Sequence, residues 1–285
     1  MKNIRPYKKD NYDFHLQNYK FHEEKLKANG IDDSVIKNSD IEKSFRNYEN
    51  LAESGLLGNL AKNISLIPEN NRENYISILY DNKSLPSNLF FEFKSSLQTV
   101  DGQSVVICPF CEHNTSKTLD HIVAKRGKNP FPEFCDMPLN LIPMCNDCNQ
   151  HKGSTFVDKN NNTTLLNLYY DTIPSERFLF VDINITTSNI LELSFKILVS
   201  NITDKTFGNK LKYTFEKLKI LDMYNEVGKQ EITEIQKYIK KYKPIKSKDD
   251  IKCTILFETE DDNNYKNVLK RECANNSTVF DFLYC

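Results

Sequence analysis

The stretch "DHIVAKRGKNPFPEFCDMPLNLIPMCNDCNQHKG", from Asp120 to Gly153, decides the fold. It holds an Asp-His pair, an asparagine at position 140 beside apolar residues, and a C-x-x-C pair followed at once by Asn149. Carboxylate, imidazole, amide and thiol groups are the side chains that bind metals and accept protons. Their gathering within the length of one supersecondary unit indicates a chemical site.

Two C-x-x-C pairs predict a structural zinc site. Cys108 and Cys111 form the first pair, Cys145 and Cys148 form the second, and residues 112–144 lie between them. Four thiolates can surround Zn²⁺ tetrahedrally at about 2.3 Å. We therefore expect zinc on these four sulfurs, with two alternatives: His113 replaces one thiolate, or the pairs are free buried cysteines brought together by chance.

Short elements surround the proposed metal. "KTLDHI" (117–122) and "NLIPMC" (140–145) predict two strands, and "NDCNQHKG" (146–153) predicts the start of a helix. A hairpin with one helix buries too little surface to be rigid by itself. Structural zinc contributes about 10–16 kcal/mol, comparable with the whole stability of a domain, about 5–15 kcal/mol. Zinc is therefore expected to clamp strand to helix and, with four ligands, to take no part in catalysis.

This arrangement resembles a known family. D-H-I at 120–122, followed by N-L-x-P-x-C-x-x-C-N-x-x-K-G from Asn140 to Gly153, is similar to the HNH, or ββα-metal, endonuclease superfamily in its four-cysteine form. The resemblance covers about residues 105–155. It implies that Asp120 and Asn149 hold a catalytic metal ion, that His121 is the general base, and that Asn140 orients His121.

The chemistry requires these residue types. Histidine can deprotonate water near neutral pH. We expect the side-chain carbonyl of Asn140 to accept the other N–H of His121. Oxygen donors such as Asp120 and Asn149 favour Mg²⁺ or Mn²⁺ over zinc. Taken singly, the same residues have simpler interpretations: a core histidine, a turn residue and a helix-start residue.

Cations near the site are candidates for phosphate contact. The nucleic-acid-binding residues we expect are Lys125, Arg126, Lys128 and Lys152. Lys117 is a further candidate, and a solvated loop is the alternative for all of these except Lys152. The family often has an aromatic residue after D-H and P-K in the loop. Here Ile122-Val123 and Ala124-Lys125 stand at those places, so the loop contacts depart from the family pattern.

The sequence predicts an α+β protein with a central zinc-stabilised ββα-metal core. Residues 1–103 form an N-terminal helical region, 104–160 the nuclease core, and 161–285 a C-terminal mixed strand and helix region. Strands are expected at 104–108, 177–185, 190–199 and 252–258. Helical periodicity from 209 to 242 is expected to break at Gly228.

Composition limits the class of protein. The 285 residues carry a net charge of −1, so nucleic-acid binding needs local patches rather than a globally basic surface. No apolar run is long enough to cross a membrane. The lack of a secretory signal, with eight cysteines in a chain of this length, leads us to expect a cytoplasmic protein without disulfides.

A second resemblance concerns biological context. "FPEF" (131–134), "YYDTIPSERFLFVDI" (169–183) and "FEKLKILDMYNEV" (215–227) are similar to standalone bacterial HNH nucleases that accompany an ATPase in Septu-type anti-phage defence. This resemblance implies an ATPase partner protein. For the nuclease itself we expect DNA, rather than RNA, as the substrate. Two alternatives stay open: a catalytically silent zinc module that binds nucleic acid or protein, and a mobile-element or restriction nuclease.

Overall fold

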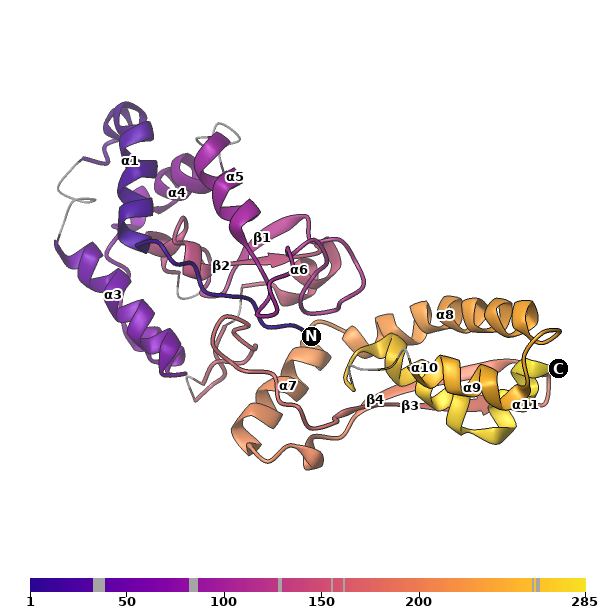
Figure 1. The fold of residues 1–285 in the computed structure, drawn as a ribbon. Coiled ribbons are helices and arrows are strands. Elements are labelled where there is room, and N and C mark those ends of the chain that lie inside the picture. Colours follow the sequence, from indigo (N-terminus) through magenta and orange to yellow (C-terminus); the bar gives the residue numbers. More distant parts are fainter. Residues whose placement is uncertain are drawn as a thin grey trace. The chain divides into compact units, whose positions relative to one another are not determined.

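The computed structural model has two compact units, one from Lys2 to Ile173 and one from Pro174 to Cys285 together with Met1 (Figure 1). It describes residues 1–285 except 33–38, 82–86, 128–129, 155, 161, 258 and 260–261. The fold is mixed α+β with two small antiparallel sheets, one in each unit. The predicted boundary after residue 103 falls inside the first unit.

Helices make up the first part of the first unit. They are α1 (Asn11–Ala28), α3 (Ser39–Glu53), α4 (Arg72–Ile76) and α5 (Ser87–Ser96), with short 3₁₀ turns η1 (Leu57–Lys62) and η2 (Glu69–Asn71), and a π turn η3 (Ser77–Asp81) that extends α4. Asp10 caps α1 by accepting from the amides of Tyr12 and Asp13. Gly30, at φ 74°, follows the end of α1, as the sequence predicts.

An aromatic core joins these helices to the predicted nuclease segment. Phe14, Phe45, Tyr48 and Tyr75 are at most 2% exposed, and the ring of Phe134 packs against those of Phe45 and Tyr48 at 5.7 and 5.0 Å. Burying a large aromatic side chain contributes about 1.5–3 kcal/mol. The N-terminal helices therefore support the segment that carries the candidate site.

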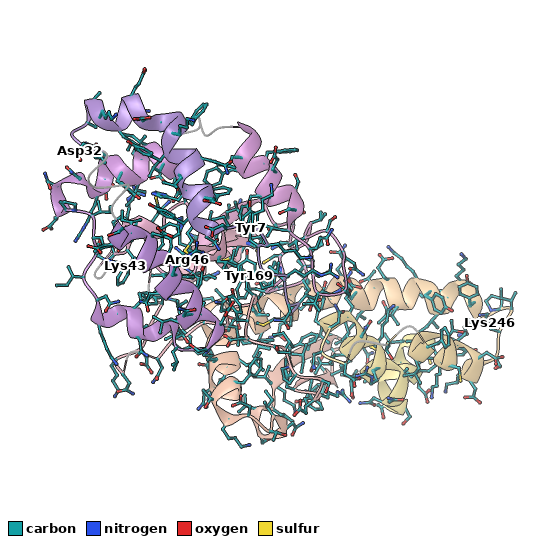
Figure 2. All side chains as sticks on the ribbon, turned by 60° about the vertical axis from the view of Figure 1, so that its left-hand side comes forward. Tyr7, Asp32, Lys43, Arg46, Tyr169 and Lys246 are labelled. Atoms are coloured by element: carbon teal, nitrogen blue, oxygen red, sulfur yellow. The ribbon has the colours of Figure 1, made fainter. Side chains whose placement is uncertain are left out.

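The ββα frame forms where the sequence predicts it. Strand β1 (Thr118–His121) pairs antiparallel with β2 (Leu141–Met144), with Asp120 opposite Ile142 and His121 opposite Leu141, and α6 (Asn146–Lys152) follows directly. The connection contains two 3₁₀ turns, η4 (Pro132–Phe134) and η5 (Pro138–Asn140). The hydroxyl of Tyr169, labelled in Figure 2, donates to the carbonyl of Leu141 at 2.6 Å and fixes the edge of β2.

The strand predicted at 104–108 is wrong. This run makes isolated bridges, Gln98 with Ser104 and Ile107 with Thr115, rather than a ladder. The chain must turn at once to present Cys108 and Cys111, so a regular strand cannot continue there.

The segment Lys2–Arg5 runs beside three distant parts of the first unit. The amide of Lys2 donates to the carbonyl of Pro109, that of Ile4 to Leu168, and that of Arg5 to Gln98. These backbone hydrogen bonds hold residues 2–5, 98–109 and 168 side by side as one layer of the first unit.

The second unit is a hairpin covered by helices. Strands β3 (Leu179–Ile185) and β4 (Leu191–Ile197) pair antiparallel, as predicted. A 3₁₀ turn η6 (Val199–Asn201) leads to α7 (Lys205–Lys217), α8 (Ile220–Tyr242), α9 (Lys248–Phe257), α10 (Tyr265–Asn275) and α11 (Ser277–Tyr284). Helix α8 packs on β4 and α10 on β3. Among the helices described, none combines the length and apolar character needed to cross a bilayer.

Two predictions for the second unit are wrong. Residues 252–257, expected as a strand, belong to α9, whose buried face is made by Ile251 and Ile255 one turn apart. The helical break lies at Lys219, with φ 52°, and Gly228 is inside α8. A Cβ at Gly228 would lie 2.7 Å from Leu193 Cδ1, so the glycine allows the helix to approach the sheet.

Several lysines of the second unit lie over aromatic rings. The Nζ of Lys243 is 4.6 Å from the ring centre of Tyr284, and that of Lys246, labelled in Figure 2, is 5.0 Å from Tyr242. This geometry is favourable for an ammonium at the surface.

Candidate metal centre and catalytic site

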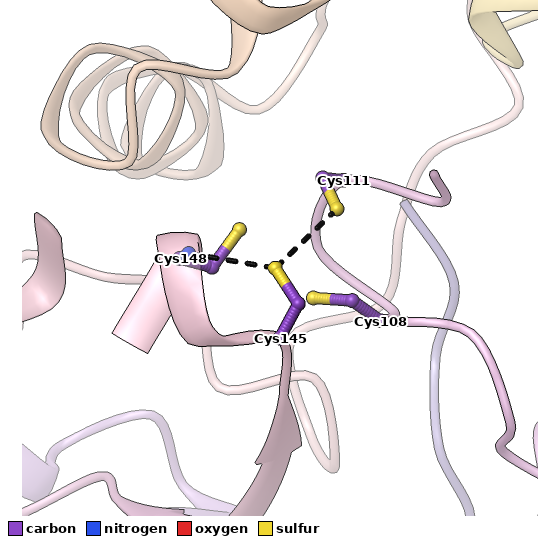
Figure 3. A group of neighbouring side chains, drawn as sticks. All are labelled: Cys108, Cys111, Cys145 and Cys148. Atoms are coloured by element: carbon purple, nitrogen blue, oxygen red, sulfur yellow. Dashed lines mark hydrogen bonds between the residues drawn. The ribbon is translucent and has the colours of Figure 1, made fainter. Parts of the chain in front are cut away.

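The four predicted zinc ligands converge on one point (Figure 3). The sulfurs of Cys108, Cys111, Cys145 and Cys148 all lie within 4.8 Å of one another, and those of Cys111 and Cys145 are 3.9 Å apart. A tetrahedron with Zn–S distances of about 2.3 Å has edges of about 3.8 Å. A disulfide bond would be about 2.05 Å long. These four residues, the cysteine cage, can therefore hold a zinc ion.

The cage is buried, and without a metal ion its four thiols shift one another's pKa values in opposite directions. All four side chains are at most 1% exposed. Hydrogen bonds from the three neighbouring thiols, Cys108 first, lower the pKa of Cys145, and the same crowding raises the pKa of Cys148. A divalent cation removes this conflict, because it stabilises every sulfur as a thiolate.

Local structure explains why the sulfurs meet. Cys145 directly follows β2 and caps α6, its sulfur accepting from the amide of Cys148 at 3.4 Å. Cys108 and Cys111 occupy a tight turn in which the amide of Glu112 donates to the carbonyl of Cys108. His113 is not part of the cage.

His121 is held in one tautomer by a backbone carbonyl. Its Nε2 lies 2.8 Å from the oxygen of Cys135, and because a carbonyl only accepts, Nε2 carries the proton. Nδ1 is then the unprotonated nitrogen, and the described residues give it no hydrogen-bond partner. Burial and then the ammonium of Lys125 hold the pKa of His121 well below its ordinary value of 6.5. The imidazole is therefore neutral, and Nδ1 is its proton-accepting nitrogen.

Asn140 does not contact His121, so the expected direct hydrogen bond is wrong. Its side-chain oxygen accepts from the amide of Val123 at 2.7 Å and the hydroxyl of Tyr48 at 3.1 Å. Its Nδ2 donates to the carbonyls of Val123 and Phe134 at 3.1 and 3.0 Å. Asn140 thus connects the two ends of the loop 123–134. The residue after this loop, Cys135, provides the carbonyl that binds His121.

A buried pair outside the motif supports the same loop. Asp136 accepts from His15 Nδ1 at 2.9 Å and from Asn18 Nδ2 at 2.8 Å, and all three side chains are fully buried. Asn18 also donates to the carbonyl of Leu79. The sequence analysis missed these residues. The available signal was two polar residues, three positions apart, on the buried face of α1.

Asp120 presents an oxygen suited to a cation. Its Oδ2 is buried without a hydrogen-bond partner, although Lys152 Nζ lies 3.0 Å away as an ion pair outside hydrogen-bond geometry. A buried carboxylate oxygen without a donor is costly unless positive charge stands beside it. Lys152 is 4% exposed, so it neutralises Asp120 rather than extending toward solvent.

Asn149 makes its side-chain hydrogen bond through Nδ2 and not through its carbonyl oxygen. The hydroxyl of Thr118 donates to the carbonyl of Met144 at 3.0 Å, so it can only accept from Asn149 Nδ2, which lies 3.2 Å away. This orientation leaves Oδ1 of Asn149 as its available donor atom. With the carboxylate of Asp120, it provides the hard oxygen ligands that Mg²⁺ and Mn²⁺ prefer.

The predicted loop cations are engaged within the protein. Lys125 Nζ lies 2.8 Å from Asp81 Oδ1, and Arg126 contacts Glu73 at 2.9 Å and Asp81 at 2.7 Å. Lys128 lies outside the described residues. Lys125 and Arg126 therefore already have carboxylate partners in this structure, and their contact with phosphate stays a prediction.

Tyr80 is a second residue that the sequence analysis missed. Its ring lies edge-on to His121 at 4.4 Å, and its hydroxyl donates to the carbonyl of Leu119 at 2.6 Å. Lys125 Nζ sits 3.7 Å from the same ring. The ring of Tyr80 therefore packs against one side of the His121 imidazole. No sequence pattern marks a contact between residues so far apart in the chain.

A short similarity links this chain to a phage protein. It is 43% identical over 51 residues to "Protein ea31" of Escherichia phage lambda, a stretch that makes up 17% of this chain and only 16% of that protein. No protein-family model matches the sequence. No solved structure matches the chain.

Proposed function

We propose that this protein is a metal-dependent endonuclease that hydrolyses phosphodiester bonds of DNA with His121 as the general base. The observation that carries the proposal is the hydrogen bond from His121 Nε2 to the carbonyl of Cys135. It makes Nδ1 the proton acceptor in a residue that follows directly after Asp120. A positioned histidine base contributes about 10²–10⁴-fold to rate.

The chain's residues divide the work of hydrolysis. Nδ1 of His121 takes a proton from water as the water oxygen bonds to phosphorus and the bond to the 3′ oxygen breaks. Asp120 and Asn149 would hold Mg²⁺ or Mn²⁺, which supplies stabilisation of charge on the leaving oxygen. Asn140 positions the loop that fixes His121. The buried Oδ2 of Asp120, which already lies 3.0 Å from the ammonium of Lys152 and accepts no hydrogen bond, supports the fit of a cation here.

Zinc in the cysteine cage has a structural role in this proposal. With four sulfur ligands it has no position open for water or substrate. The cage joins the turn before β1 to the start of α6, so it fixes Asp120 and Asn149 relative to each other.

The proposal extends to biological context on the strength of sequence similarity alone. We propose that the nuclease acts in bacterial anti-phage defence with an ATPase partner protein. Co-purification from the native operon tests this: recovery of an ATPase supports the partnership, and recovery of the nuclease alone contradicts it.

A plasmid-cleavage assay tests the chemistry. Wild-type protein should cut in the presence of Mg²⁺ or Mn²⁺, and His121→Ala should cut at least about 10²-fold more slowly. His151→Ala is the matched control, because His151 lies on α6 in the same frame but bonds only to the carbonyl of Asp147. Absence of metal-dependent cutting by the wild type would refute the nuclease proposal.

One observation favours a second candidate, a catalytically silent zinc module that binds nucleic acid or protein. Lys152 already neutralises Asp120 at 3.0 Å, as a cation would. Manganese binding followed by electron paramagnetic resonance separates the two functions. Binding that is lost in Asp120→Asn supports the nuclease, whereas no binding by the wild type supports the silent module.

A further inference from the structure

A groove opens beside the candidate base. It has a volume of about 460 Å³ and is lined by Tyr80, Asp81, Phe90, Phe91, Lys94, Lys117 and Leu119. Tyr80 contacts the ring of His121, and Leu119 directly precedes Asp120. A ligand in this groove would therefore lie next to the reacting groups.

The groove carries positive charge that is not neutralised. Within the described part of the chain, neither Lys94 nor Lys117 has a carboxylate partner. Lys94 Nζ instead donates to the carbonyl of Lys117 at 3.3 Å, which places both residues on the same wall. The acid of the groove, Asp81, is already paired with Lys125 and Arg126. Two exposed ammonium groups are thus available for phosphate.

An exposed aromatic ring lines the same groove as these two lysines. Phe91 is 71% exposed, whereas its neighbour Phe90 is 7% exposed and packs in the core. An exposed ring beside two lysines is the combination that binds single-stranded nucleic acid, in which bases stack on aromatic side chains and phosphates meet cations.

We infer that this groove binds the nucleic acid strand beside the scissile phosphate, with one unstacked base against Phe91 and phosphates at Lys94 and Lys117. The inference rests on the proposed function and specifies its substrate: DNA that is single-stranded, or locally opened, at the cut. It also assigns phosphate contact to Lys94 and Lys117 in place of the paired Lys125 and Arg126.

Fluorescence anisotropy with labelled oligo-dT, without added divalent metal, tests the groove. Phe91→Ala should weaken binding about 5- to 150-fold, the range for loss of one stacked base. Changing both lysines to glutamine should reduce the slope of log affinity against log salt by about 1.4, because each single-strand phosphate contact contributes about 0.7. Matched controls on α1, Phe21→Ala and Lys20→Gln, should bind as the wild type does.

An abasic oligomer of the same length separates stacking from a general defect. Wild type and Phe91→Ala should bind it equally. Equal affinity of the two proteins for oligo-dT would overturn the inference, as would an equal loss on both probes or tighter binding of wild type to duplex. Metal-dependent cutting that needs His121 but not Phe91 would refute only the inference that the groove binds the nucleic acid strand. The nuclease proposal would still stand.

Discussion

Asn140→Ala should destabilise the protein severely, although Asn140 touches neither the metal ligands nor the base. The amide is fully buried and makes four hydrogen bonds. Its removal leaves two buried backbone groups without a partner, the amide and the carbonyl of Val123, whereas the carbonyl of Phe134 still accepts from the amide of Met137 at 3.3 Å. Tyr48 retains a second acceptor, the carbonyl of Leu139 at 3.3 Å.

The expected magnitude follows from these two groups. Each orphaned backbone group costs about 1–3 kcal/mol, so the substitution should lower the free energy of unfolding by at least about 2 kcal/mol. That is a substantial part of the stability of a typical domain, about 5–15 kcal/mol. For a unit of this size it corresponds to a fall in Tm of about 4–8 °C.

Calorimetry of zinc-loaded protein measures this change, and Asn149→Ala is the control. Asn149 is partly exposed and makes one side-chain hydrogen bond, so its loss should change stability by less than about 1 kcal/mol. The same control should abolish metal-dependent cleavage if Asn149 is a ligand. An Asn140→Ala protein as stable as wild type would refute the reasoning, since the amide would then not be holding the loop.

The remaining predictions concern metal, pH and packing. A strong chelator should release one zinc per chain and unfold the ββα frame, because the ion contributes about 10–16 kcal/mol. A chromogenic zinc indicator measures the release, and circular dichroism measures the loss of secondary structure. Secondary structure retained after zinc release would contradict the structural role of the ion. Burial lowers the pKa of His22 from 6.5, so the unfolded state binds more protons below that pH, and stability should fall on acidification below 6.5. Urea titrations should show a smaller fall for His22→Gln, and an unchanged fall would reject His22 as a source. Gly228→Ala should destabilise by about 1–3 kcal/mol, because the new Cβ meets Leu193 at 2.7 Å. Gly208→Ala, whose Cβ would meet nothing closer than 3.6 Å, should stabilise its helix by about 0.5–1 kcal/mol; equal effects of the two would contradict the packing described.

The frame of the site could be predicted because its constraints are short and local. Cysteine spacing, strand-forming runs beside it and a polar helix start place β1, β2, α6 and the cysteine cage. The partners of His121 and Asn140 could not be predicted, because they are backbone carbonyls and amides, which every residue possesses. Only the folded loop decides which of them faces an imidazole or an amide.

Helix α9 shows where a local signal was overlooked. Its alternating β-prone residues suggested a strand, but Ser247 and Asp250 form a reciprocal cap: the serine hydroxyl accepts from the Asp250 amide at 3.1 Å and donates to its carboxylate. This S-x-x-D spacing marks a helix start. The buried pair of Asp136 with α1 was hidden for a different reason, since its partners are more than a hundred residues apart.

The backbone bonds of Lys2–Arg5 have a consequence for folding during translation. Their partners near residues 98–109 emerge from the ribosome long before Leu168, the partner of Ile4. The thiols at 145 and 148 also emerge before Leu168, so the nascent chain can capture its metal while one neighbour of the early segment is still missing. Assembly of this layer is therefore a late event. Stalled chains in which residue 148 has emerged from the ribosome but residue 168 has not should hold zinc yet leave residues 2–5 open to protease.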